Sequence, residues 1–220
     1  MTGITKARPP RSPWAVLSVL CLGLFMILLD GTIVNVAIPK IMTALNTDLA
    51  GVEWVMNGYV LMFAVTLVTL GRLGDLYGRR LLFVAGMALF TLSSLACGLA
   101  PSIELLVAFR VVQGLGGAAM MPSTLSIVAA VFPADKRGAA MGIWGGVSGL
   151  ATAIGPSLGG LVVDAASWRW IFLINRRSAS CPLRWRCASC RNPGTRRPSA
   201  PWTCPAWVSS PAPCSVSPSP

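Results

Sequence analysis

Two charged side chains, Asp30 and Arg110, lie inside long apolar stretches of this sequence. A charge within the hydrocarbon layer of a membrane costs about 3 kcal/mol or more on insertion scales, and such residues usually mark the route of an ion or a substrate. We therefore expect Asp30 and Arg110 to couple proton or substrate movement to a conformational change. The alternative is an ion pair that only fixes helix packing.

The positions of the two charges in their apolar runs predict a similar depth. Pro39 and Ile103 mark the outer ends of their two predicted helices. Asp30 lies ~13 Å from Pro39 along one helix, and Arg110 lies ~10 Å from Ile103 along the other. If the two helices are neighbours, both charges could face one cavity.

The residues after Arg110 continue one polar and glycine-rich helical face. Arg110, Gln113, Gly114 and Gly117 recur at the spacing i, i+3, i+4 and i+7. We expect Gln113 to share the coupling role of Arg110. The two glycines would let another helix approach closely.

A short basic segment, Gly71-Arg-Leu-Gly-Asp-Leu-Tyr-Gly-Arg-Arg80, separates two apolar runs. Its glycines permit a tight turn, and its arginines favour the cytoplasmic side of a membrane. We expect a gating loop there, in which Asp75 can interact with the N-terminus of a neighbouring helix. The residues that would carry this role are Gly71, Gly74, Asp75, Gly78, Arg79 and Arg80.

A second glycine-rich segment lies within the last complete apolar run. Gly155, Gly159 and Gly160 surround Pro156, and proline removes a backbone hydrogen bond and kinks a helix. We expect these four residues to form a bendable and closely packed part of a helix.

The composition is that of a membrane protein. The chain has 220 residues, of which 11% are charged and 54% are hydrophobic, whereas soluble domains average about 25% charged residues. Several apolar runs are long enough to cross a bilayer, which takes about 20 residues. We predict helices at 14–38, 52–70, 81–100, 103–131 and 139–163, and the start of a sixth at 168.

The basic residues predict the orientation, because they concentrate in cytoplasmic segments. With the N-terminus inside, the basic residues of the inner segments are Lys6, Arg8, Arg11, Arg72, Arg79, Arg80, Lys136 and Arg137. The outer segments hold only Lys40 and Arg169. We expect a multi-pass protein of the cell membrane with a cytoplasmic N-terminal tail, residues 1–13.

These motifs together resemble the major facilitator superfamily. The 71–80 segment resembles the loop between the second and third helices of that family, and the Arg110 run resembles its fourth-helix motif, whose arginine is implicated in proton coupling. The segment around Pro156 resembles the antiporter motif of the exporters, with Ala151 where the family usually has glycine. The runs at 29–39 and 168–175 resemble the fourteen-helix drug:proton antiporter branch.

The resemblance covers residues 14–175 and implies an all-α, polytopic fold. We expect a truncated N-terminal six-helix bundle, with five full spans and the start of a sixth, that lacks the C-terminal bundle. The resemblance implies multidrug efflux and antibiotic resistance, in which proton entry drives export of a small-molecule substrate. We expect the chain as given to transport little or nothing.

Residues 176–220 differ from the rest of the chain. They contain seven arginines, no acidic residue and five of the seven cysteines. One interpretation is a disordered basic tail, and another is metal binding through Cys187 and Cys190, which is a weak signal without histidine. We prefer a shifted reading frame after Asn175. In the shifted frame, the first base of each codon of this segment becomes the middle base of a new codon. Codons for Cys, Trp and most Ser residues begin with T, and codons with a middle T encode apolar residues.

The sequence contains no enzyme-like constellation. It has no histidine, and we find no catalytic triad and no phosphate-cradling loop, so we expect no enzyme, no metal and no cofactor. The partners we expect are the lipid bilayer, protons and a small molecule, and not nucleic acid. The alternative is a non-transporting membrane protein whose basic tail binds acidic lipid or nucleic acid.

Overall fold

The computed structural model describes residues 13–173 and contains five long helices. Each is long and apolar enough to cross a membrane. Their bounds are α1, Pro13–Leu45; α2, Leu49–Tyr77; α3, Arg79–Gly98; α4, Ile103–Val131; and α5, Ala134–Ala165. A further helical turn at 169–173 follows α5. The all-α, polytopic prediction is therefore confirmed.

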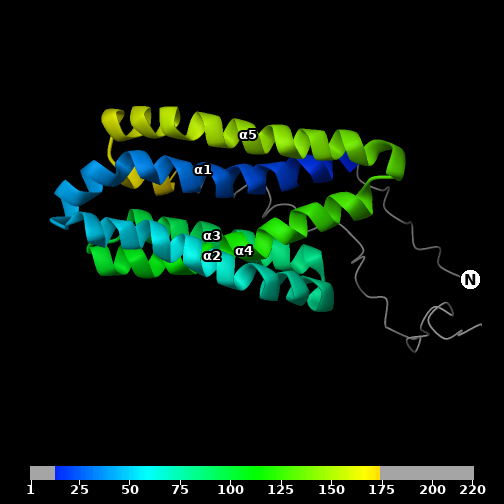
Figure 1. The fold of residues 1–220 in the computed structure, drawn as a ribbon, viewed down its shortest axis with the longest axis horizontal. Helices are drawn as coiled ribbons and strands as arrows, with labels where there is room; N and C mark the ends of the chain where they lie inside the picture. Colours follow the sequence, from blue (N-terminus) through cyan, green and yellow to red (C-terminus); the bar gives the residue numbers. More distant parts are fainter. Residues whose placement is uncertain (1–12, 174–220) are drawn as a thin grey trace, which may run out of the picture.

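The helices run alternately up and down between two ends of the bundle (Figure 1). One end, which we call the Gly78 end, holds the α2–α3 and α4–α5 connections. The other, which we call the Lys40 end, holds the α1–α2, α3–α4 and post-α5 connections. Short connections between antiparallel helices place chain neighbours side by side.

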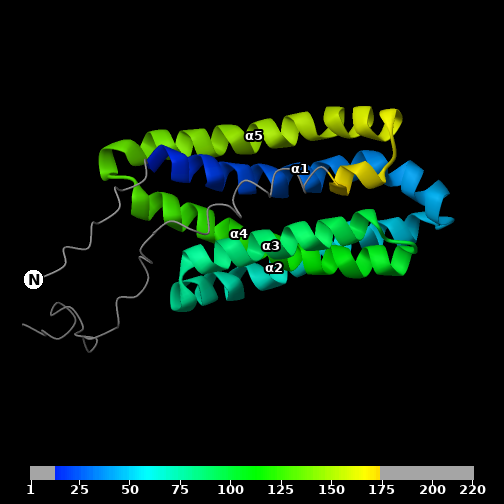
Figure 2. The same ribbon diagram turned by 180° about the vertical axis from the view of Figure 1, so that it is seen from behind.

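The five helices form two layers, as the views from both sides show (Figures 1 and 2). In one layer α1 packs along α5, and in the other α4 packs on both α2 and α3. Fewer contacts join α1 to α4 and α2. Two apolar clusters fill the interior, one toward the Gly78 end around Leu20, Phe83 and Met120, and one toward the Lys40 end around Ile41 and Trp168.

Glycines set the closest helix contacts within the second layer. A Cβ on Gly116 would lie 2.6 Å from the backbone nitrogen of Phe90, and a Cβ on Gly114 would lie 2.6 Å from the carbonyl oxygen of Tyr59. Glycine therefore lets the backbone of α4 contact the backbones of both α3 and α2. The sequence predicted a bare face at Gly114 but not the second one at Gly116.

Several predicted helix ends were wrong, although α4 matches its prediction of 103–131. Helix α1 does not end at Pro39 but continues to Leu45, because a proline removes only one backbone hydrogen bond and membrane helices tolerate that loss. The observed helices α2 and α5 extend beyond the predicted 52–70 and 139–163 because a helix does not stop where its residues become polar.

The predicted 71–80 loop is the largest of these corrections. Residues 71–77 complete α2, and Arg79 already begins α3. Only Gly78 leaves the helical conformation, with φ 100° and ψ 127°. A residue with a side chain rarely adopts a positive φ without strain, so the turn depends on this single glycine. The residues between the predicted helices 103–131 and 139–163 likewise include the start of α5, which begins at Ala134 with Pro133 as its N-cap.

Candidate functional site

The centre of the bundle holds a buried ion pair between Asp30 and Arg110. Asp30 lies near the middle of α1 and is 1% exposed, while Arg110 of α4 is 0% exposed. Arg110 Nη1 lies 2.5 Å from Asp30 Oδ2. The structure thus brings the two charges, for which the sequence predicted a similar depth, into direct contact inside the protein.

Gln113 closes a triangle with this pair, one turn after Arg110. Its Nε2 donates to Asp30 Oδ1 at 3.0 Å, and its Oε1 accepts from Arg110 Nη1 at 3.0 Å. The amide therefore contacts both charges at once and orients the carboxylate. We call Asp30, Arg110 and Gln113 the polar triad.

Other helices contribute to the surroundings of the polar triad. Arg110 Nε donates to the carbonyl oxygen of Val55 on α2 at 3.4 Å. The Cys97 thiol of α3 lies 3.7 Å from Gln113 Oε1. Four helices therefore meet at this site, and it joins α1 of one layer to the α2–α3–α4 layer.

The predicted gating residues lie at the Gly78 end and not at the polar triad. Arg79 forms an ion pair with Asp75 one turn earlier, across the break at Gly78. Its other Nη donates to the Pro122 carbonyl at 3.4 Å and to the Ser126 hydroxyl. Arg79 thus ties the α2–α3 turn to the second half of α4.

The remaining residues of that segment have different surroundings. Gly74 is buried, and a Cβ there would lie 3.2 Å from Leu82 of α3. Gly71 faces Pro122 of α4 at ordinary contact distance. Arg80 is half-buried near the start of α3.

The glycines around Pro156 are divided between two faces of α5. Gly155 and Gly159 are buried against α1, where a Cβ on Gly155 would overlap Thr32 and a Cβ on Gly159 would lie 2.9 Å from Ile33. Pro156 is exposed, and no described atom lies within 4 Å of a Cβ position on Gly160. Close packing by all three glycines was therefore wrong for Gly160. Ala151 continues the buried face.

The Lys40 end carries two cations whose contacts the sequence did not predict. Lys40 Nζ donates to the Val163 carbonyl at 2.6 Å and pairs with Asp164 at 2.9 Å, so it caps the C-terminus of α5. Arg169 donates to the carbonyl of Ala100 just after α3. Both cations thus interact with the negative ends of helix dipoles.

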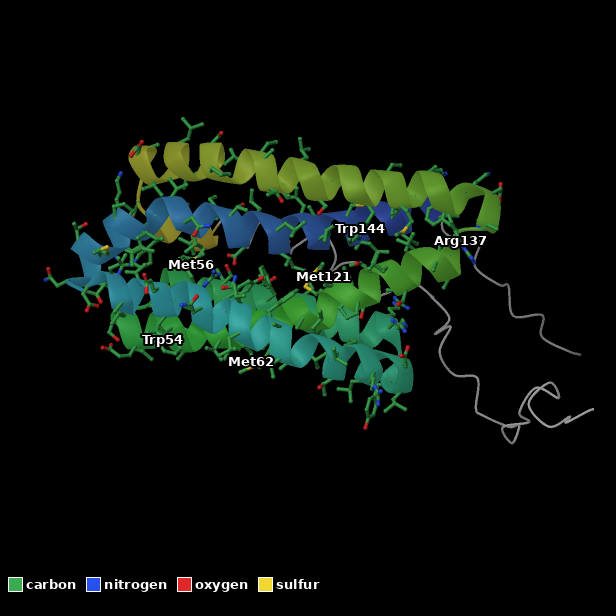
Figure 3. The ribbon with its side chains drawn as sticks, in the orientation of Figure 1. Trp54, Met56, Met62, Met121, Arg137 and Trp144 are labelled. Carbon is green, nitrogen blue, oxygen red and sulfur yellow. The ribbon has the colours of Figure 1, made fainter. Side chains whose placement is uncertain are left out.

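An apolar groove of about 370 Å³ lies along α2 and α4. Trp54 and Met62, labelled in Figure 3, mark its α2 side. None of the polar triad lines it. On the far side of α4, the indole of Trp144 from α5 reaches Thr124 at 3.3 Å, which is one of the few links between α4 and α5.

Comparison with known proteins gives consistent results. Residues 20–175 match the sequence model of the family described as the Major Facilitator Superfamily. The Tetracenomycin C resistance and export protein of Streptomyces glaucescens is 47% identical over 163 residues, which are 74% of this chain and 30% of that protein. The Multidrug resistance protein Stp of Mycobacterium tuberculosis is 48% identical over 155 residues, 70% of this chain and 29% of that protein.

A solved structure shows the same fold. The inward-facing, unoccupied structure of a bacterial homologue of the human lysosomal transporter Spinster matches with a TM-score of 0.67 and 16% identity, covering 89% of this chain and 47% of that one. The chain thus spans under a third of the two curated relatives above and about half of this structure.

Proposed function

The chain belongs to the Major Facilitator Superfamily, and on that premise we propose that it forms the N-terminal bundle of a proton-coupled exporter of small antibiotic-like molecules. The family and the relatives named above are transporters and not enzymes. The protein is a multi-pass membrane protein. The proton coupling, the substrate and the orientation with a cytoplasmic N-terminus are parts of the proposal.

The observation that carries this proposal is the buried polar triad between the two helix layers. A fully desolvated ion pair is weak evidence for stability alone, because its desolvation cost can exceed the attraction. Within a membrane such a pair is more often functional. The pair lies at the contact between α1 and α4, so any change in the pair changes the interaction between the two helix layers.

The proposed coupling step is the transfer of a proton to Asp30. A proton that binds a carboxylate oxygen of Asp30 leaves a neutral acid, and the ion pair with Arg110 is lost while the positive charge of Arg110 remains. Gln113 contacts both partners and would follow the change. Release of that proton on the other side of the membrane restores the pair and completes the cycle.

The two glycine segments have supporting roles in this proposal. The 71–80 segment, through Gly78 and the Arg79 contacts with α4, would act as a conformational latch on the cytoplasmic side. Gly155 and Gly159 would keep α5 packed on α1, so that these two helices move together.

The substrate class is proposed from the relatives. Their names describe export of tetracenomycin C and multidrug resistance. In transporters built from repeats, the substrate site lies near the midplane between the repeats. We therefore propose that this chain needs a second bundle and transports little or nothing by itself.

A chimera tests the proposal. Residues 1–175 of this chain would replace the matching part of the tetracenomycin exporter, and efflux of tetracenomycin C would be measured in everted vesicles with an imposed proton gradient. We expect gradient-driven transport that Asp30→Asn abolishes and that Lys40→Met, at the Lys40 end, retains. Undiminished gradient-driven transport by the Asp30→Asn chimera would refute the coupling role.

The alternative function is that of a non-transporting membrane protein whose basic tail binds acidic lipid or nucleic acid. That function depends on residues 176–220, which lie outside the described residues, and the family match at 20–175 does not favour it.

A further inference from the structure

The guanidinium of Arg110 is only partly hydrogen-bonded. Its Nε and Nη1 donate to Val55, Asp30 and Gln113. Its Nη2 is buried and has no hydrogen-bond partner within residues 13–173. An unsatisfied buried donor on a charged group is costly, which makes the other contacts of this guanidinium important.

Two aromatic rings contact the same guanidinium. Arg110 Cζ lies 4.5 Å from the ring centroid of Tyr59 and 5.7 Å from that of Phe172. Both distances are within the range of cation–π attraction, which is stronger when the cation is desolvated. Tyr59 comes from α2, and Phe172 comes from the turn after α5, where Ser94 donates to its carbonyl oxygen at 2.9 Å.

The ring of Tyr59, and not its hydroxyl, makes this contact. Tyr59 Oη is buried and has no hydrogen-bond partner in the described part of the chain. The ring also stacks on Phe63, with centroids 6.1 Å apart. The contacts that the structure shows for Tyr59 beside Arg110 are therefore those of its ring.

We propose that Tyr59 is a positioning residue for proton coupling, whose ring holds the guanidinium of Arg110 against Asp30. Phe172 contributes the same contact from a greater distance. This inference rests on the proposed coupling role of Asp30. Its consequence is that Arg110 stays in place when Asp30 binds a proton, so the pair re-forms when the proton leaves.

Within residues 13–173, the titratable groups that interact with Asp30 include Arg110 on α4, Tyr59 on α2 and Cys97 on α3. Helix α5 meets the next turn of α1 with Gly155 and Gly159, which do not titrate. If the ring of Tyr59 is removed, Arg110 is held less firmly and stabilises the Asp30 carboxylate less. We therefore expect a pH-dependent change at the polar triad to move to a higher pH.

The reporter for this test is Cys97, because its thiol contacts Gln113 of the polar triad. Cys21 is also buried in the membrane part of the bundle, but it packs in the apolar cluster toward the Gly78 end. The full chain is reconstituted in lipid vesicles and treated with N-ethylmaleimide over a pH series. Mass spectrometry of the peptides then gives the ratio of Cys97 to Cys21 alkylation.

In the wild-type chain we expect the ratio to rise as the pH falls, and Asp30→Asn to abolish this transition. Tyr59→Leu shifts the midpoint upward by about one pH unit, the tenfold change in proton affinity that loss of a desolvated cation–π contact can produce. Tyr59→Phe, which keeps the ring, retains the wild-type midpoint. Phe172→Leu gives a smaller shift in the same direction and serves if Tyr59→Leu does not fold.

The matched control is Phe90→Leu, which removes a fully buried ring of α3 that makes no cation–π contact within residues 13–173. A shift in Phe90→Leu equal to that in Tyr59→Leu would overturn the inference, because any loss of core volume would then suffice. A shift in Tyr59→Phe equal to that in Tyr59→Leu would also overturn the inference, because the hydroxyl and not the ring would then be responsible. No shift in the folded ring-removal variants, with Asp30→Asn still effective, would overturn only this inference. A transition that persists in Asp30→Asn would instead refute the proposed function.

Discussion

The buried pair of Asp30 and Arg110 predicts a strongly non-additive response to mutation. Removing one partner of a buried ion pair typically costs about 3–5 kcal/mol, because it leaves an uncompensated buried charge. We expect Asp30→Asn to lie near the lower end, since asparagine keeps the volume and can accept a hydrogen bond from Arg110. Arg110→Gln removes the cation that contacts the Asp30 carboxylate, and we expect its cost to lie within the same range.

The double variant Asp30→Asn/Arg110→Gln carries no buried charge at this site. We therefore expect it to cost about 2 kcal/mol less than the sum of the single variants, which is within the range of coupling between contacting residues. The free energies would come from unfolding in mixed micelles with increasing dodecyl sulfate, followed by helical circular dichroism. If the double variant lost as much free energy of unfolding as the two single variants together, the idea that Asp30 and Arg110 depend on one another would be refuted.

Three further predictions concern single residues of the bundle, and a fourth concerns the gene. Gly116→Ala should destabilise the bundle by about 1–3 kcal/mol, because its Cβ would meet backbone atoms of α3. Gly142→Ala, whose Cβ would have no described neighbour outside its own helix within 4 Å, should stabilise the bundle by up to about 1 kcal/mol. Thermal unfolding in detergent would compare the two variants, and equal effects would contradict this explanation. Gly78→Ala should cost about 1–2 kcal/mol in the same assay, since φ is 100° there. Lys40→Met should change stability by less than about 1 kcal/mol, because the Lys40–Asp164 pair is exposed, and a larger loss would show that the cap on α5 dominates. Sequencing of the gene around codon 175 should reveal a long apolar reading frame downstream, and its absence would end the frameshift interpretation.

The sequence predicted the membrane-spanning elements well. Five spans and the start of a further helix follow from apolar runs of bilayer length, and the α4 bounds, Ile103–Val131, agree with the prediction. Asp30 and Arg110 were identifiable because a charge stands out against an apolar background. Helix ends were harder to predict. Polar residues such as those of 71–77 and 134–138 continue the backbone hydrogen-bond pattern after the apolar run has ended.

The residues around Arg110 were not predictable in the same way. Tyr59 and Phe172 stand in apolar runs where an aromatic residue is ordinary, and 113 positions separate them in the chain. A tyrosine within a span is a weak signal of a cation–π contact, because its hydroxyl usually has a hydrogen-bond partner and that partner alone can explain the residue. The contacts of Lys40 with Val163 and Asp164 also join distant parts of the chain.

The amino-acid sequence by itself determined that the chain crosses a membrane several times and buries opposite charges, because hydropathy is a property of each segment alone. Only the tertiary structure decided that Gly155 and Gly159, but not Gly160, pack on α1. It also decided that Arg110 lies between a carboxylate, an amide and two rings. These contacts depend on how each helix is rotated about its axis against its neighbours, and that rotation is set by packing of all the helices together.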